Sequence, residues 1–547
     1  MPQVIPPMDN VADLFHRLEQ LNAIGAALSK ERDINRLLEG ILMAAKDITR
    51  ADGGTLYRMT EDRSALRFEI MRTDSLGIAL GGTTGSPIGL PNLPLRNEAG
   101  QPNDALVAVY AAMHDETVNI ADAYGADGFD FSGTRKFDER TGYRSQSFLT
   151  VPMKDHEGEI IGVLQLINAI DQETGEVTAF SVTDQSLAES LASQAAIALT
   201  NRLLISQLEK LFESFINLIN LAIDEKSPYT GGHCQRVPAL TMMLAEAVDA
   251  TTEGPLAAFH MDDQDRYELK IAGLLHDCGK VTTPVHVVDK ATKLQTIFDR
   301  IHLIDTRFEV LKRDAEIAAL RRQLALRKPA DAPAEKRIQR ELTKQLRALD
   351  EERDFLRQAN IGSEAMPEEA QQRVRQIGQQ HQWRNVESVT TDFLTADEIE
   401  NLTIRAGTLT QRERETINYH IVATIKMLEQ LPWPKHLKHV PEYAGGHHER
   451  MDGKGYPRGL TREQMSVQAR TMGIADIFEA LTARDRPYKH GMKLSQAMTI
   501  LANFRKNGHI DPDLFEVFVK QGVYRRYAEQ FLNPEQIDAV DEAGLLA

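Results

Sequence analysis

The chain has few cysteines and no long apolar run. Cys234 and Cys278 are the only cysteines in 547 residues, too few for a disulfide framework, so we expect a reducing compartment. No stretch approaches the ~20 apolar residues of a membrane-spanning helix. The first residues, MPQVIPPMDN, also lack the basic segment and apolar core of a secretion signal. These absences predict a cytoplasmic protein without a membrane span.

An excess of positive charge is also missing. Lysine and arginine number 63 against 80 aspartates and glutamates, which gives a net charge of -17. Nucleic acid polymers and membrane surfaces are bound through extended positive potential, so neither is an expected partner. An anionic ligand would need a local positive charge, supplied by metal ions and a few basic side chains.

The length of the chain exceeds what one hydrophobic core supports and predicts several structural units.

The first two hundred residues combine helical and strand patterns. Apolar residues recur at helical spacing twice within 11–50, and TLYRM, ALRFEIM, SFLTVPM and IIGVLQLIN alternate like antiparallel strands. With the stretch TRKFDERTGYRSQSFLTVPMKDHEGEIIGVLQLINA, residues 11–200 resemble a GAF domain of the cyclic-nucleotide type. The resemblance implies an antiparallel sheet with helices, and a cyclic nucleotide as a candidate ligand. Lys136, Asp138 and Glu139 are the candidate ligand contacts; the alternative is a structural ion-pair cluster at a loop.

A long helix is predicted between the two halves, over residues 187–223. Leu187, Leu191, Leu208 and Leu218 belong to an apolar stripe at helical spacing. Such a stripe can form a coiled coil with a second chain, or it can pack within its own chain. Because the helix joins two domains, we expect a homodimer in which it couples a sensor to an effector.

The second half contains five short segments rich in metal-binding residue types: HCQRV, HDCGK, the helix of His420, HHERMDGKGYP and DIFEALTARDRPYK. Histidine together with carboxylate suits first-row metals better than calcium. Asp277 has two oxygens and can bridge two cations roughly 3.5–4 Å apart. The candidate ligands are His233, His276, Asp277, His420, His447, His448 and Asp476. Together they predict a hydrolytic centre with two metal ions.

These segments, in this order, resemble the HD-GYP family of metal-dependent phosphodiesterases. The resemblance implies an all-α HD-type phosphohydrolase domain over residues 224–547 and a multidomain α+β chain. It places His233, His276 and Asp476 on one metal and His420, His447 and His448 on the other. Iron or manganese is the implied metal. The implied function is that of a signalling phosphodiesterase, which hydrolyses cyclic di-GMP to pGpG. Further hydrolysis to GMP and a hybrid cyclic GMP-AMP substrate both stay open.

The same resemblance suggests residues on the substrate side. Lys280 lies three residues after Asp277, and Gly279 between them permits a turn at the helix end. Lys280 is the candidate to orient the phosphate or to assist the leaving oxygen. The alternative is a lysine that only stabilises the C-terminal end of a helix. The substrate-binding candidates are Tyr456, Arg486, Lys489 and Glu479, with Arg236 and Arg450 as further possibilities. Glu479 could instead orient a metal ligand, since it lies three residues after Asp476. His302, His381 and His509 are interpreted as structural.

Two features depart from the family pattern. Some members carry a glutamate for a third metal one turn before the first histidine; Tyr229 stands there, so two metals are expected. Residues 294–402 form an insertion with two charged helices, which we expect to form a hairpin. Pro329 and Pro333 interrupt the helical pattern between them.

The alternative function is a nucleotide-binding regulatory protein with little turnover, which signals through the insertion or the GAF domain. The complete ligand set argues against it.

Overall fold

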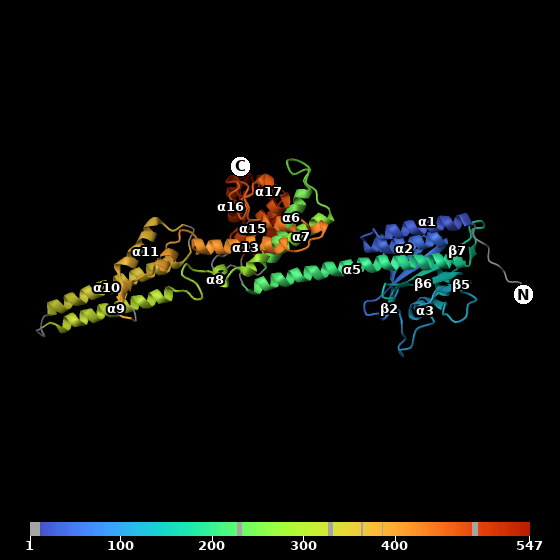
Figure 1. Ribbon diagram of the computed structural model, residues 1–547, viewed down its shortest axis with the longest axis horizontal. Coiled ribbons are helices and arrows are strands. Elements are labelled where there is room, and N and C mark those ends of the chain that lie inside the picture. The colour runs from blue at the N-terminus through green and yellow to red at the C-terminus, as the bar shows by residue number, and fades with distance from the viewer. Residues whose placement is uncertain (1–10, 227–231, 327–331, 363–364, 385–386, 484–490) are drawn as a thin grey trace. The chain divides into compact units, whose positions relative to one another are not determined.

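Two compact units make up the chain, Met1–Leu211 and Phe212–Ala547. The structure is a computed structural model that describes residues 11–226, 232–326, 332–362, 365–384, 387–483 and 491–547 (Figure 1). No helix within these residues is long and apolar enough to cross a membrane.

The first unit is built on one antiparallel sheet in the order β3-β2-β1-β7-β6-β5, with β4 beside β2 and β8 beside β7. The strands are β1 Ala51–Met59, β2 Ala65–Thr73, β3 Ile78–Gly81, β4 Leu93–Pro94, β5 Val118–Ile120, β6 Phe148–Lys154, β7 Ile160–Ile170 and β8 Val177–Thr178. The register aligns Leu56 of β1 with Leu164 of β7, and Leu164 with Val151 of β6. These three buried side chains form an apolar row on one face, as the alternation of the sequence predicts.

Helices cover both faces of this sheet. The helices of this unit are α1 Val11–Leu28, α2 Ile34–Thr49, α3 Val107–His114, α4 Ser132–Thr141 and the first part of α5 Val182–Lys226, which continues into the second unit. Ile41 of α2 and Leu191 of α5 share a core with the Leu164 row. Val109 of α3 packs with Tyr57 and Val163 on the other face. The predicted combination of an antiparallel sheet with flanking helices is confirmed.

Helix α5 extends five residues before and three residues after the predicted range. Its apolar stripe divides into two parts. Leu187 and Leu191 are buried in the core of the first unit, whereas Leu208 and Leu218 are 64% and 58% exposed. The first part of the stripe therefore packs within the chain, and the second part is left largely uncovered by the described residues.

The second unit is helical. Its main helices are α6 His233–Asp249, α7 Asp263–Leu275, α8 Val285–Val288, α13 Gln411–Glu429, α14 Val440–Gly445, α15 Val467–Thr482, α16 Leu494–Lys506, α17 Pro512–Lys520, α18 Val523–Phe531 and α19 Glu542–Leu546. Most of these helices contribute to one continuous core that includes Val237, Ile271, Phe478 and Phe518. A capping box starts α13: Thr410 accepts from the Glu413 amide, and Glu413 accepts from the Thr410 amide.

The insertion has a separate core. Helices α9 Ile301–Leu324 and α10 Ala332–Asn360 pack against each other, as predicted for a hairpin. The sequence did not indicate the elements that follow: α11 Glu368–Gln380, the strand pair β9 Gln382–Arg384 and β10 Thr390–Asp392, and α12 Ala396–Leu402. Phe308, Leu356 and Phe393 join these elements in the core.

Candidate functional site

The seven predicted metal ligands come from five helices and the turns that follow them. His233 is the first residue of α6, and His276 and Asp277 directly follow the last turn of α7. His420 lies within α13, and Asp476 lies within α15. His447 and His448 follow α14. The structure brings these side chains together into two groups, each with ligand atoms within 4.8 Å of one another.

The first group contains His233, His276, Asp277 and Asp476. The Nε2 atom of His233 lies 3.0 Å from Oδ2 of Asp277 and 3.4 Å from Oδ1 of Asp476. The Nε2 atom of His276 lies 3.2 Å from the same Oδ2 of Asp277. Two imidazole nitrogens and two carboxylate oxygens therefore converge, which is a suitable donor set for a first-row divalent metal.

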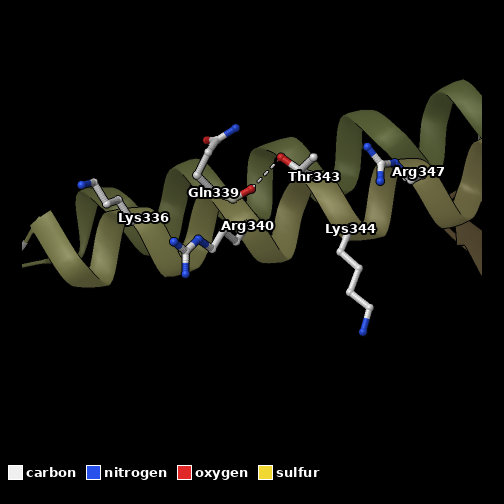
Figure 2. A pocket seen from close by; sticks show the side chains of 6 residues that line it. All are labelled: Lys336, Gln339, Arg340, Thr343, Lys344 and Arg347. Carbon is white, nitrogen blue, oxygen red and sulfur yellow. Dashed lines mark hydrogen bonds between the residues drawn. The ribbon is translucent and has the colours of Figure 1, made fainter.

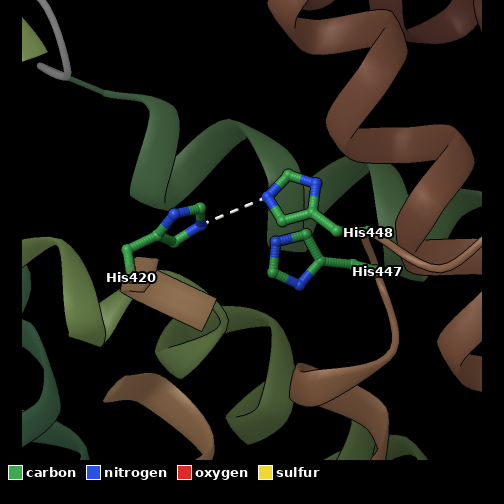
Figure 3. Close-up of side chains that lie close together, drawn as sticks. All are labelled: His420, His447 and His448. Carbon is green, nitrogen blue, oxygen red and sulfur yellow. Dashed lines mark hydrogen bonds between the residues drawn. The ribbon is translucent and has the colours of Figure 1, made fainter. Parts of the chain in front are cut away.

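The second group contains His420, His447 and His448 (Figure 3). The three imidazole rings turn toward one another, and Nε2 of His420 lies 3.2 Å from Nε2 of His448. Oδ1 of Asp277 lies 3.3 Å from Nε2 of His420. Asp277 thus presents one oxygen to each group, which is the geometry that a bridging carboxylate requires.

The hydrogen bonds of the other ring nitrogens fit a metal centre. Nδ1 of His276, His420 and His447 each faces a backbone carbonyl, of Gly273, Ile417 and Ala444 respectively. Donation from Nδ1 leaves the Nε2 lone pair free to bind a metal. Nε2 of His447 and Oδ1 of Asp277 are buried and make no hydrogen bond within the described part of the chain. Such unsatisfied buried acceptors are costly unless they bind a cation.

Burial also sets the charge of the ligands. It lowers the pKa of His448 to about 4 and the pKa of His447 well below its usual value, so both rings are neutral near pH 7. Burial alone would raise the pKa of Asp277, but Lys280 and His276 outweigh it and hold that pKa well below the usual range. Neutral imidazoles and an ionised carboxylate are the forms that bind metals.

Burial raises the pKa of Cys234 to about 12 and that of Cys278 to about 11, so these thiols stay protonated and are not thiolate ligands.

Glu479 faces His233, one of the predicted metal ligands. It is fully buried on α15; its Oε2 lies 2.5 Å from Nδ1 of His233, and its Oε1 accepts from Nε of Arg236 at 2.8 Å. The sequence predicts either a substrate contact or a ligand-orienting role for Glu479. These contacts favour the second role, with Arg236 as the group that holds the carboxylate.

We expect Glu479→Gln to weaken metal binding about 10- to 100-fold, the range typical of second contacts to a metal-bound histidine. The amide keeps the volume but loses the charge that fixes the His233 ring. Metal dissociation constants measured by calorimetry on protein stripped of metal test this, with the exposed Glu463→Gln as control. Equal affinities for wild type and Glu479→Gln would show that Glu479 does not orient the ligand.

Lys280 contacts the carboxylate of Asp277. Its Nζ lies 2.6 Å from Oδ2 of Asp277, and its side chain is 21% exposed. The turn that carries it, Cys278–Thr282, is a short 3-10 helix. We expected Gly279 to permit a turn at the helix end. The structure gives another reason for glycine at this position: a Cβ atom would lie 2.0 Å from the His420 carbonyl oxygen and 2.5 Å from the Thr424 nitrogen. Glycine therefore allows the Asp277 segment to approach α13 closely.

A cavity of about 380 Å³ lies beside the second group. Its lining includes His447, His448, Asp476 and Tyr456, whose ring stacks on His448 with the ring centres 4.9 Å apart. His509 also lines the cavity, which the sequence did not reveal because an isolated histidine carries no motif.

The predicted substrate residues Arg486 and Lys489 lie outside the described residues. Tyr229, on which the expectation of two metals rests, also lies outside them.

In the first unit, the three candidate ligand residues lie on helix α4 rather than in a loop. Asp138 is buried and accepts hydrogen bonds from the Ser145 amide, the Ser145 hydroxyl and the Tyr124 hydroxyl. Lys136 and Glu139 form no ion pair with other described residues, so the expected structural ion-pair cluster is not found there. Ligand binding by this unit stays a prediction.

A second hollow lies on the insertion and shares no residue with the cavity beside the metal ligands (Figure 2). It is lined by side chains along one face of α10, namely Lys336, Gln339, Arg340, Thr343, Lys344 and Arg347. This face is a local positive surface on an acidic chain.

Comparison with known proteins assigns domains to both units. A GAF domain model matches residues 33–199, and two HD domain models match residues 230–354 and 394–514. A cyclic di-GMP phosphodiesterase of Pseudomonas aeruginosa is 48% identical over 79 residues, which are 14% of this chain and 18% of the relative. A 3'3'-cGAMP-specific phosphodiesterase of Vibrio cholerae is 44% identical over 81 residues, 15% of this chain and 19% of the relative. A cyclic di-GMP phosphodiesterase of Thermotoga maritima is 31% identical over 136 residues, 24% of this chain and 36% of the relative. The chain thus spans less than two fifths of the length of each of these relatives.

Proposed function

Because the chain carries a GAF domain and HD domains, we propose that it is a metal-dependent phosphodiesterase that hydrolyses cyclic di-GMP to pGpG under control of its GAF domain. The observation that carries the proposal is the position of Asp277, whose two oxygens face two separate groups of imidazole nitrogens. A centre of this kind suits an anionic phosphodiester even in a protein of net charge -17.

The proposed mechanism assigns a task to each group of residues. His233, His276 and Asp476 would hold one metal, His420, His447 and His448 the other, and Asp277 both. When bound, two divalent metals of this class polarise the phosphate and make a water molecule nucleophilic near neutral pH. Lys280, held by Asp277 at 2.6 Å, donates a hydrogen bond to a phosphate oxygen as negative charge develops. We propose iron or manganese as the metal, since the donors are imidazole and carboxylate.

The bases of the preferred substrate also have to be assigned. Relatives named as cyclic di-GMP and as 3'3'-cGAMP phosphodiesterases both match this chain. We propose cyclic di-GMP as the preferred substrate and cyclic GMP-AMP as the alternative. Protein reconstituted with iron or manganese and incubated with an equal mixture of both dinucleotides tests the preference by chromatography. Faster loss of cyclic di-GMP supports the proposal, whereas faster loss of cyclic GMP-AMP reverses the assignment.

We further propose that α5 forms a coiled coil with a second copy of the chain. Ile197, Leu204, Leu208, Leu211, Phe215 and Leu218 are all at least 44% exposed. Their spacing of seven, four, three, four and three residues is the heptad spacing of a coiled-coil seam. The same helix ends, along the sequence, shortly before His233, so its register could carry a signal from the GAF domain to the metal centre.

The free, buried cysteines agree with function in the cytoplasm.

The double variant Leu208→Glu with Leu211→Glu should therefore be monomeric, because it places charges in the seam. Light scattering coupled to gel filtration measures the mass. Lys210→Glu with Asn217→Glu is the control, since both residues occupy exposed positions away from the seam. We also expect the turnover of the monomer to differ from that of the dimer at equal metal content. A dimeric seam variant would contradict the coiled coil, and identical turnover would make α5 a passive spacer.

A further inference from the structure

The cavity beside the predicted metal ligands is lined by two chemically different groups of side chains. One group is His447, His448 and Asp476, which belong to the two candidate metal groups. The other group is Arg450, Lys454 and His509. Among the described residues, Arg450 and Lys454 are the only lysine or arginine residues in the lining. One cavity therefore joins a metal centre to a pair of cations.

The guanidinium of Arg450 is held in a fixed position. Its Nε and Nη2 donate to the two carboxylate oxygens of Asp452 at 3.0 and 2.8 Å. The Asp452 amide donates to the Gly508 carbonyl at 3.0 Å, which anchors this loop to the segment before His509. Nη1 of Arg450 makes no hydrogen bond to any part of the chain that the structure describes. A fixed guanidinium with free N–H groups is a preorganised site for an anionic oxygen.

Lys454 adds a second, adaptable cation. Its side chain is 78% exposed, and its Nζ is 3.8 Å from Oδ2 of Asp452. Because two cations lie beside one carboxylate, the cluster of Arg450, Asp452 and Lys454 carries a net positive charge. His509 stacks on Phe504 with the ring centres 4.5 Å apart, and burial together with Arg450 lowers its pKa. The imidazole is therefore neutral and does not repel the two cations.

A cyclic dinucleotide contains two phosphodiester groups, but the metal centre acts on one at a time. The other phosphate remains a monoanion within the same molecule and needs its own cationic contact when it enters a cavity. We infer that Arg450 and Lys454 bind this second phosphate, so that the cavity selects diesters that carry two phosphates. This inference rests on the proposed phosphodiesterase function and adds the residues that recognise the part of the substrate that is not cleaved.

The test compares substrates with two phosphates and with one. Metal-loaded wild type, Lys454→Met, Arg450→Gln and the double variant are assayed with cyclic di-GMP and with bis(p-nitrophenyl) phosphate, which has a single phosphate. We expect KM for cyclic di-GMP to rise about 10- to 100-fold in each single variant, the range typical of losing one charged hydrogen bond. The small diester should show no comparable loss. Arg525→Gln, which removes a different ion-paired arginine at 2.8 Å from Glu542, is the control.

The possible outcomes separate the inference from the proposed function. An equal loss on both substrates would overturn the inference, because it would mean that the loop supports the metal centre. An unchanged KM for cyclic di-GMP would also overturn it. If wild type cleaves only the small diester, the proposed function fails, and calorimetric dissociation constants for cyclic di-GMP then replace KM. Weaker binding by Lys454→Met would support the second-phosphate site in that case, and unchanged binding would reject it.

Discussion

Replacing Asp277 by alanine is expected to remove at least one metal ion and to reduce hydrolysis to the background rate. The two carboxylate oxygens of Asp277 face different groups, with Oδ2 3.0 Å from His233 and Oδ1 3.3 Å from His420. Without this carboxylate both groups lose a shared anionic donor, and the spacing between the two metals is no longer fixed. Elemental analysis and turnover measured on the same preparation test this expectation.

Asp277→Asn is the matched variant for this position, because it keeps the size of the side chain and replaces one oxygen by an amide nitrogen. It should bind metal weakly at one group and show no measurable turnover. Asp263→Ala, at an exposed position of α7, is the control for loss of a carboxylate. Full metal content with unaltered turnover in Asp277→Ala would refute the assignment of the centre.

Lys280→Met should retain both metals and lower kcat about 10²- to 10³-fold, the range found when one donor to a developing negative charge is removed. The lysine lies against Asp277 without being a metal ligand itself, so its loss affects the transition state more than the metals. Parallel measurements of metal content, KM and kcat test this.

Lys270→Met is the control for this variant, because Lys270 also forms an ion pair, with Glu213 at 2.9 Å. Lys280→Arg should restore part of the activity, since arginine keeps the charge but changes its geometry. A Lys280→Met protein that loses metal or unfolds would assign the lysine a structural role.

Local patterns predicted many of the longer helices and strands, such as α5 and β7. The capping box at Thr410 could be predicted because its partners are three residues apart. The two charged helices of the insertion were visible from their apolar spacing. The strands β9 and β10 were not, because three-residue strands depend on pairing with a partner rather than on a pattern of their own. Helix periodicity also could not show that Leu187 is buried while Leu208 is exposed, since the difference depends on which part of α5 packs into the core of the first unit.

The candidate metal ligands could be proposed from the sequence because short motifs hold several of them in fixed spacing. Contacts between distant segments were not recognisable in the same way. The carboxylate of Glu479 meets His233, 246 positions earlier in the chain, and spacing along α15 indicates only that Glu479 shares a face with Asp476. His509 reaches the cavity through the packing of the segment between α16 and α17, which no local signal in the sequence specifies.

The most direct test of a two-metal phosphodiesterase is the product formed from cyclic di-GMP by the full chain with both metals bound. The reaction is followed by chromatography, with the metal content of each sample measured and with Asp277→Ala in parallel. We expect wild type to convert cyclic di-GMP to pGpG in proportion to its metal content, and Asp277→Ala to form none. Wild-type protein that holds two metals and leaves cyclic di-GMP intact would contradict the central claim.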